Sequence, residues 1–312
     1  MRRSLTLLCL AATATVAMAQ NPPPESVTVT GTKSREVMRG FIDSVVSPTH
    51  FIGKIARWEV PICPYTVGIK PEAAKFVTDR LKDVAREVGA RVSANPACKY
   101  NIEIVFTKTP QALLDDMKQN QPELLGYQSS SEDLDRLATF SRPIEARYTT
   151  ATQDLRGKVE IDSPHTTNGE GVTMRLPCSM LGGGSPNRIC TKQLRHVRKV
   201  DVTGTLLGNG LRSNFYHIVI VVDPRQVAGE ELDAVSDYIA MMALTQLGSL
   251  DSCQNLPSIV NLLPKGCTNR SGRLTETDLG YLRGLYRMRS GMELVVQKNE
   301  IASEMAKAAN EP

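Results

Sequence analysis

The apolar positions between residues 71 and 88 recur at the spacing of an α-helix. Four aliphatic residues form one stripe along it: Val77, Leu81, Val84 and Val88. Pro71 suits the first helical position, and Gly89 can end the helix in the left-handed conformation. The pattern therefore predicts a helix over residues 71–88 that packs on a core through this stripe.

Alternating and continuous apolar runs predict strands. Residues 101–107 place Ile102, Ile104 and Phe106 on one face, which is typical of a half-buried strand. The β-branched run from Ile218 to Val222 predicts a strand buried on both faces. Weaker patterns predict strands at residues 55–60, 144–152, 158–161 and 200–207.

A second long helix is expected from Glu230 to Leu247. The chain is apolar all round from Tyr238 to Leu244, so this helix should lie inside the protein. Further helical patterns occur at residues 34–46, 110–139 and 298–309, and at a capping box formed by Thr275 and Asp278. The element order predicts an α+β fold with helices packed on a mixed, twisted sheet, followed by a C-terminal helical part.

The N-terminus has the three parts of a secretory signal peptide. A positive start precedes the apolar run Leu5–Val16, and Ala17-Met18-Ala19 is a small-x-small cleavage motif. We expect cleavage after Ala19 and a periplasmic or secreted protein, with a lipoprotein anchor at Cys9 as the rival interpretation. No later segment reaches the roughly 20 apolar residues of a membrane-spanning helix.

The expected organisation is a signal peptide over 1–19, an N-terminal arm and short helix over 20–50, and a single domain over 51–312. A loop-rich insertion is expected near 162–190, where Gly, Pro and Asn are frequent. Removal of residues 1–19 leaves 35 basic against 33 acidic residues, a net charge of about +2. That balance argues against a nucleic-acid partner.

Six cysteines remain after removal of the signal peptide, and an even count in an exported chain predicts disulfides. Six cysteines allow 15 pairings, which sequence alone does not separate. The order along the chain favours three local bridges: Cys63–Cys98, Cys178–Cys190 and Cys253–Cys267.

Short motifs in a fixed order cover most of residues 51–292. They are Arg57-Trp58 with Pro61, Asn101-Ile102 through Phe106, Leu244-Thr245-Gln246-Leu247-Gly248 with Asp251, Ser258-Ile259, Leu274-Thr275 with Asp278, Leu282-Arg283, Leu285-Tyr286 and Gly291-Met292. In these motifs the chain resembles a family of uncharacterised exported bacterial proteins related to zincin-type metallopeptidases. The resemblance implies a zincin-like domain whose buried helix would carry H-E-x-x-H.

The zinc ligands of that motif are missing here. Aligning H-E-x-x-H with the predicted helix puts Met242 and Gln246 at the ligand positions and Ala243 at the general base. A thioether and an amide are poor zinc ligands, and alanine cannot move a proton. We therefore expect no metal, no cofactor and no catalysis at this helix, which is either a degenerate zinc helix or a core helix of another fold.

Two other groups of residues could carry function. An active metal-dependent hydrolase remains the alternative if His165, His196 and nearby acids supply ligands, whereas His50 and His217 have no histidine partner at ligand spacing. A basic cluster could bind an anionic polymer or simply form a solvated strand edge, which we favour: Arg188, Lys192, Arg195, His196, Arg198 and Lys199. The expected function is a non-catalytic binding or envelope-associated module, whose partner would be an envelope polymer or a protein.

Overall fold

The computed structural model describes residues 31–162, 172–177, 189–194, 201–203, 205, 208–248 and 251–308. Its centre is a five-stranded mixed sheet in the order β1-β2-β7-β3-β4. The strands are β1 (Pro64–Val67), β2 (Ile102–Phe106), β7 (Arg212–Val222), β3 (Ile144–Gln153) and β4 (Val159–Ile161). Strands β1, β2 and β7 are parallel, and β3 and β4 are antiparallel to their neighbours. A separate two-stranded sheet contains β5 (Val172–Pro177) and β6 (Ile189–Leu194).

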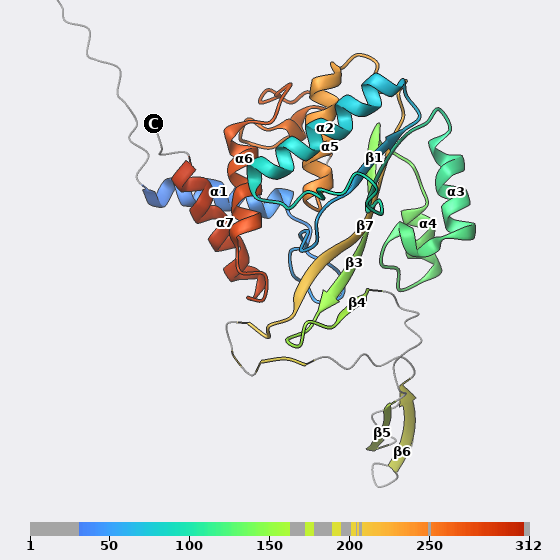
Figure 1. Ribbon diagram of the computed structural model, residues 1–312. Coiled ribbons are helices and arrows are strands. Elements are labelled where there is room, and N and C mark those ends of the chain that lie inside the picture. Colours follow the sequence, from blue (N-terminus) through green and yellow to red (C-terminus); the bar gives the residue numbers. More distant parts are fainter. Residues whose placement is uncertain are drawn as a thin grey trace, which may run out of the picture.

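Helices cover both faces of the five-stranded sheet (Figure 1). They are α1 (Gly31–Val45), α2 (Pro71–Val88), α3 (Pro110–Asn120), α4 (Ser131–Leu137), α5 (Leu232–Leu244), α6 (Glu276–Arg287) and α7 (Leu294–Ala308), with 3-10 turns η1 (Pro122–Leu125) and η3 (Ile259–Asn261). The α+β class is as expected. Within the described ranges, none of the helices combines the length and the apolar character needed to cross a membrane.

Strand β7 separates two apolar cores, as its β-branched run predicts. Ile218 and Ile220 face the larger core, which they share with α2 and α5. Val219 and Val221 point to the opposite face and pack with residues of α3 and η1 in a smaller core. Figure 1 shows α2 and α5 on one side of the sheet and α3 and α4 on the other.

Local signals set the bounds of α2 and α6. Helix α2 begins at Pro71 and ends at Gly89, which has φ 89° and donates its backbone N–H to the last turn. Its predicted stripe is buried. Helix α6 begins with the predicted capping box, in which the Thr275 side chain accepts from Asp278 N and the Asp278 side chain accepts from Thr275 N. Both predictions are confirmed.

Several predicted bounds are wrong. Residues 55–60 form no strand, because Arg57 makes only an isolated parallel bridge to Asn214 of β7. Strand β1, four residues long and opened by a proline, was not anticipated. The described part of 200–207 contains one isolated bridge, Thr205 to Gly208, instead of a strand. The polar region 110–139 is helical but divides into α3, η1 and α4.

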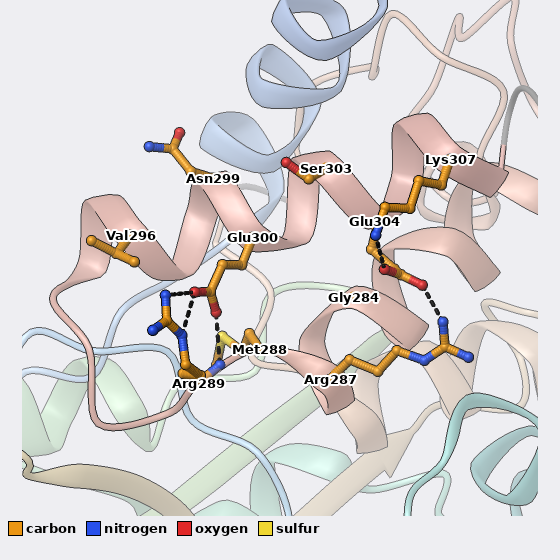
Figure 2. Close-up of a pocket in the computed structure, with 10 residues that line it drawn as sticks. All are labelled: Gly284, Arg287, Met288, Arg289, Val296, Asn299, Glu300, Ser303, Glu304 and Lys307. Atoms are coloured by element: carbon orange, nitrogen blue, oxygen red, sulfur yellow. Dashed lines mark hydrogen bonds and ion pairs between the residues drawn. The ribbon is translucent and has the colours of Figure 1, made fainter.

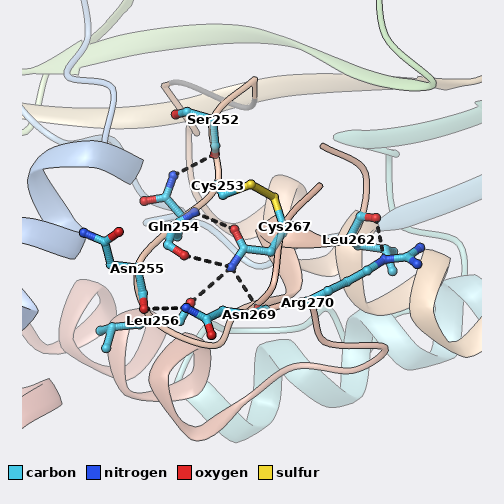
Figure 3. Close-up of a disulfide and its surroundings, with 10 residues drawn as sticks. Ser252, Cys253, Gln254, Asn255, Leu256, Leu262, Cys267, Asn269 and Arg270 are labelled. Carbon is cyan, nitrogen blue, oxygen red and sulfur yellow. Dashed lines mark hydrogen bonds between the residues drawn. A yellow bond between two sulfur atoms is a disulfide. The ribbon is translucent and has the colours of Figure 1, made fainter. Parts of the chain in front are cut away.

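Two of the three predicted disulfides are present. Cys63 and Cys98 are joined with Cα atoms 6.1 Å apart, and Cys253 and Cys267 with Cα atoms 5.3 Å apart. Near the second bridge, the Asn261 side chain donates to the carbonyls of three loop residues: Gln254 (3.2 Å), Leu256 (3.1 Å) and Asn269 (2.9 Å). Figure 3 shows the bridge within this hydrogen-bonded loop. The third pair lies outside the described residues, since Cys178 and the Cys190 side chain are not among them.

Candidate functional site

The C-terminal end of α5 is where the resemblance implies metal ligands. Helix α5 lies on the larger-core face of the sheet, and its residues from Ala234 to Leu244 are all buried. The helix stops at Leu244, because Thr245 adopts an extended conformation with φ −147° and ψ 149°. The predicted end at Leu247 is therefore three residues too late.

Side chains from three distant segments satisfy the last carbonyls of α5. Tyr148 Oη donates to Met242 O at 2.9 Å, Trp58 Nε1 to Ala243 O at 2.8 Å and Tyr286 Oη to Leu244 O at 3.0 Å. Carbonyls at a helix C-terminus have no partner within the helix, so a buried end requires such donors. This end of α5 is closed by protein rather than open to a ligand.

Tyr281 completes this arrangement, in which its hydroxyl lies 2.7 Å from Thr245 Oγ1. We name four side chains the aromatic cap: Trp58 and Tyr281, which are buried, and Tyr148 and Tyr286, which are partly buried. Burial raises the pKa of each of the three tyrosines far above its ordinary value. The phenols therefore stay protonated and remain hydrogen-bond donors at every physiological pH.

The three residues aligned with H-E-x-x-H do not form a ligand set. Met242 is 1 % exposed and belongs to the apolar core, and Ala243 is also buried. Gln246 lies beyond the helix, where its carbonyl accepts from Ser47 N at 3.1 Å and its buried Oε1 has no hydrogen-bond partner. Placing Gln246 on the same helical turn as Met242 was wrong, because the backbone leaves the helix at Thr245.

Two of the four histidines, His50 and His217, lie in the part of the chain that the structure describes. His50 stacks on Tyr127 with ring centroids 6.2 Å apart. His217 lies on β7, where Nε2 is 3.4 Å from a carboxylate oxygen of Glu103 on β2. Among the described residues, no three His, Cys, Asp or Glu side chains converge as a metal site would require. His165 and His196 lie outside the described residues.

The predicted basic cluster falls almost entirely outside the described residues as well. Lys192 lies on β6, but nothing of its side chain is described, and the other members lie beyond the described ranges: Arg188, Arg195, His196, Arg198 and Lys199. Both interpretations of this cluster stay predictions.

The hollow between α6 and α7 has a volume of about 500 Å³ and is lined by charged side chains (Figure 2). Arg289 Nε donates to Glu300 at 2.7 Å, and Arg287 pairs with Glu304 across the same seam. The two helices approach closely at Gly284, where an added Cβ would lie 3.0 Å from Ile301 Cα. These contacts account for the hollow as the edge of a helix–helix contact.

Lys54 is a buried ammonium with a structural role. Its Nζ donates to Asn209 Oδ1 at 2.5 Å, Leu211 O at 2.9 Å and Gly291 O at 2.9 Å. Burial lowers the pKa of Lys54, while the carboxylate of Glu293 opposes that shift. All three N–H groups of the ammonium are used, so Lys54 joins three chain segments and has no donor left for a substrate.

Two exposed tyrosines stack on the surface at the outer edge of the sheet. Tyr65 of β1 and Tyr100 are each 43 % exposed, with ring centroids 4.4 Å apart and planes at 10°. Tyr65 is the register neighbour of Glu103 on β2, and Glu103 approaches His217 on β7. We name these four residues the tyrosine band: Tyr65, Tyr100, Glu103 and His217.

Sequence reasoning missed the aromatic cap and the tyrosine band. The partners in the cap come from distant segments, and no local pattern identifies them. The tyrosine band left a usable signal, because Tyr65 and Tyr100 each follow a cysteine of the predicted bridge Cys63–Cys98 by two residues. That pairing brings the two segments that carry the rings together.

Comparison of the sequence with models of protein families, with curated proteins and with solved structures finds no match in any of the three.

Proposed function

We propose that this protein is a non-catalytic binding module of the extracytoplasmic space, a zincin-like pseudo-peptidase that binds an envelope polymer or protein. The observation that carries this proposal is the aromatic cap. Donors from Trp58, Tyr148 and Tyr286 occupy the α5 carbonyls at the position where a zincin would present its metal ligands.

The disulfides support the compartment. Cys63–Cys98 and Cys253–Cys267 are stable in oxidising environments and uncommon in reducing cytosol. Together with the N-terminal signal pattern, they favour a periplasmic or secreted location, with the signal peptide removed after Ala19.

The zincin-like part of the proposal is supported by the position of α5. The helix follows β7 in the chain and packs on the larger-core face of the mixed sheet, as the resemblance implies. It differs from a zinc helix because it ends at Leu244 and is apolar on all sides. A helix that had lost its metal would be free to acquire both features.

Metal content and peptidase activity test the proposal. Protein purified without chelator and analysed by inductively coupled plasma mass spectrometry should contain far less than one zinc per chain, and casein and peptide libraries should remain uncleaved. The matched control is the double variant His165→Ala/His196→Ala, which should give the same readings. Stoichiometric zinc, with peptidase activity that is removed by chelator and by the double variant, would establish the active hydrolase instead.

A further inference from the structure

The tyrosine band is a surface whose exposed aromatic rings are held in place by the fold. Tyr65 and Tyr100 stack with nearly parallel planes, and both remain accessible to solvent. Thr66 Oγ1 lies 2.8 Å from Thr78 Oγ1 of α2, so the alternation along β1 directs Tyr65 to the opposite face of the sheet. Helix α2 therefore does not cover the ring of Tyr65.

Covalent and hydrogen-bonded links fix the two rings. The bridge Cys63–Cys98 joins the segments that carry them, two residues before each ring. Asn101 adds a second link, since its Oδ1 accepts from Cys63 N at 2.7 Å and its Nδ2 donates to Pro61 O at 3.2 Å. A prearranged aromatic surface loses little conformational entropy when it binds a ligand.

Polar groups continue the surface beyond the rings. Glu103 shares the face of Tyr65 because the two residues are paired in register across parallel strands. Its side chain is 43 % exposed, so it can accept hydrogen bonds from a ligand. His217 Nε2 lies 3.4 Å from Glu103 Oε1, and this neighbour lowers the pKa of Glu103.

This combination of groups fits a hydroxyl-rich ligand with apolar faces. The negative face of an aromatic ring attracts the C–H groups of a β-linked pyranose, and a carboxylate accepts hydrogen bonds from sugar hydroxyls. The same carboxylate would repel the phosphates of a single-stranded nucleic acid. We propose that Tyr65, Tyr100, Glu103 and His217 form a subsite for a β-1,4-linked polysaccharide chain, an inference that rests on the proposed role as a binding module.

The two stacked rings cover each other's inner faces, so in this subsite a pyranose ring stacks on the free outer face of one tyrosine. Hydroxyls of the same or the next sugar donate to Glu103. His217, half-buried behind the carboxylate, acts as a positioning residue that orients Glu103. The ligand groups in these contacts are uncharged, so binding of this kind depends little on ionic strength. The predicted basic cluster, by contrast, would bind an anionic polymer in a salt-dependent way.

Co-sedimentation of the mature protein with insoluble glycans tests the proposal. The probes are peptidoglycan sacculi, chitin and cellulose, which share β-1,4-linked rings and differ in their substituents. Saturable binding to at least one of them is expected. It should be retained in about 1 M NaCl, where the Debye length is only about 3 Å. Tyr65→Ala and Tyr100→Ala should each weaken binding by about tenfold or more, a loss of about 1.4 kcal/mol.

Matched variants separate stacking from misfolding. Tyr65→Phe and Tyr100→Phe keep the ring faces and should bind like the wild type. Phe76→Ala removes an exposed aromatic side chain of α2 that lies outside the tyrosine band, and it should also leave binding unchanged. Glu103→Gln keeps the shape of the side chain and should weaken binding, while thermal melting confirms that all variants are folded.

Three outcomes would overturn the subsite. They are no binding to any of the three glycans, equal binding by Tyr65→Ala and Phe76→Ala, and binding that disappears in high salt. Tyrosine-dependent binding of a polyproline peptide without glycan binding would replace the polysaccharide by a protein partner. None of these results bears on zinc content, so the proposed non-catalytic role is judged separately by metal analysis.

Discussion

Arg57 and Trp58 are consecutive residues that cap the C-termini of two different helices. Arg57 Nη1 donates to the carbonyls of Tyr286 at 3.0 Å and Met288 at 2.8 Å, where α6 ends. Trp58 Nε1 donates to Ala243 O near the end of α5. Arg57 also forms an isolated bridge to Asn214 of β7, so one short segment ties both helices to the sheet.

The tyrosine hydroxyls at the end of α5 should contribute measurably to stability. Tyr148→Phe and Tyr286→Phe each leave a buried carbonyl without its donor, so each should lower the free energy of unfolding by about 1–3 kcal/mol. Urea denaturation followed by circular dichroism measures the change. Tyr65→Phe removes a hydroxyl from an exposed ring and should change stability by less than about 0.5 kcal/mol. Losses as small as this in both Tyr148→Phe and Tyr286→Phe would contradict the structural role of the aromatic cap.

Alkaline pH should destabilise the protein through the same tyrosines. Unfolded tyrosine releases its proton near pH 10, whereas burial keeps the pKa of Tyr148, Tyr281 and Tyr286 much higher in the folded state. The contribution of these protonated tyrosines to the free energy of unfolding is fully present below about pH 10. It is lost as the pH rises, at about 1.4 kcal/mol per pH unit for each tyrosine. Denaturation midpoints measured from pH 8 to about pH 11 should show this decline.

The control for the alkaline effect is Tyr286→Phe. It removes one of the titrating groups, so its stability should fall less steeply than that of the wild type, by about 1.4 kcal/mol per pH unit. Equal slopes in the two proteins would mean that Tyr286 is accessible enough to ionise without unfolding.

Local signals in the sequence predicted much of the fold. Pro71 and Gly89 bound α2, and the pair Thr275 and Asp278 opens α6, because these residues act on backbone groups within a few positions. The unbroken β-branched run of β7 predicted burial on both faces for a similar reason, because the whole pattern lies within one short segment of the chain.

Distant contacts decided the features that the sequence did not predict. The predicted helix continues to Leu247, but α5 ends at Leu244, where Trp58 and Tyr286 from distant segments donate to its last carbonyls. Residues 55–60 look like a strand but find only a single bridge to β7. The tyrosine band depends on the pairing of Cys63 with Cys98. The order of the cysteines along the chain favoured this pairing but did not exclude the others.

The apolar stripe of α2 provides a test of the larger core. Leu81 is fully buried between the helix and the sheet, so Leu81→Ala should lower the free energy of unfolding by about 2–5 kcal/mol. Phe76→Ala on the exposed side of the same helix should cost much less, because its ring is 40 % exposed. Chemical denaturation of both variants gives the comparison. A cost below about 0.5 kcal/mol for Leu81→Ala would place the stripe in solvent.

Removal of either disulfide should destabilise the protein, and the bridge that closes the longer loop should cost more. Cys63 and Cys98 are separated by 35 residues, and Cys253 and Cys267 by 14. Chain entropy then predicts losses of about 4 kcal/mol for Cys63→Ser/Cys98→Ser and about 3 kcal/mol for Cys253→Ser/Cys267→Ser. Denaturation of the oxidised proteins measures the losses, and a reducing agent should abolish the difference between each variant and the wild type. The reverse order of losses would show that native packing around the bridges outweighs loop entropy.

Non-reducing peptide mapping should also recover Cys178 joined to Cys190, and a peptide joining Cys98 to Cys178 would contradict the local pairing.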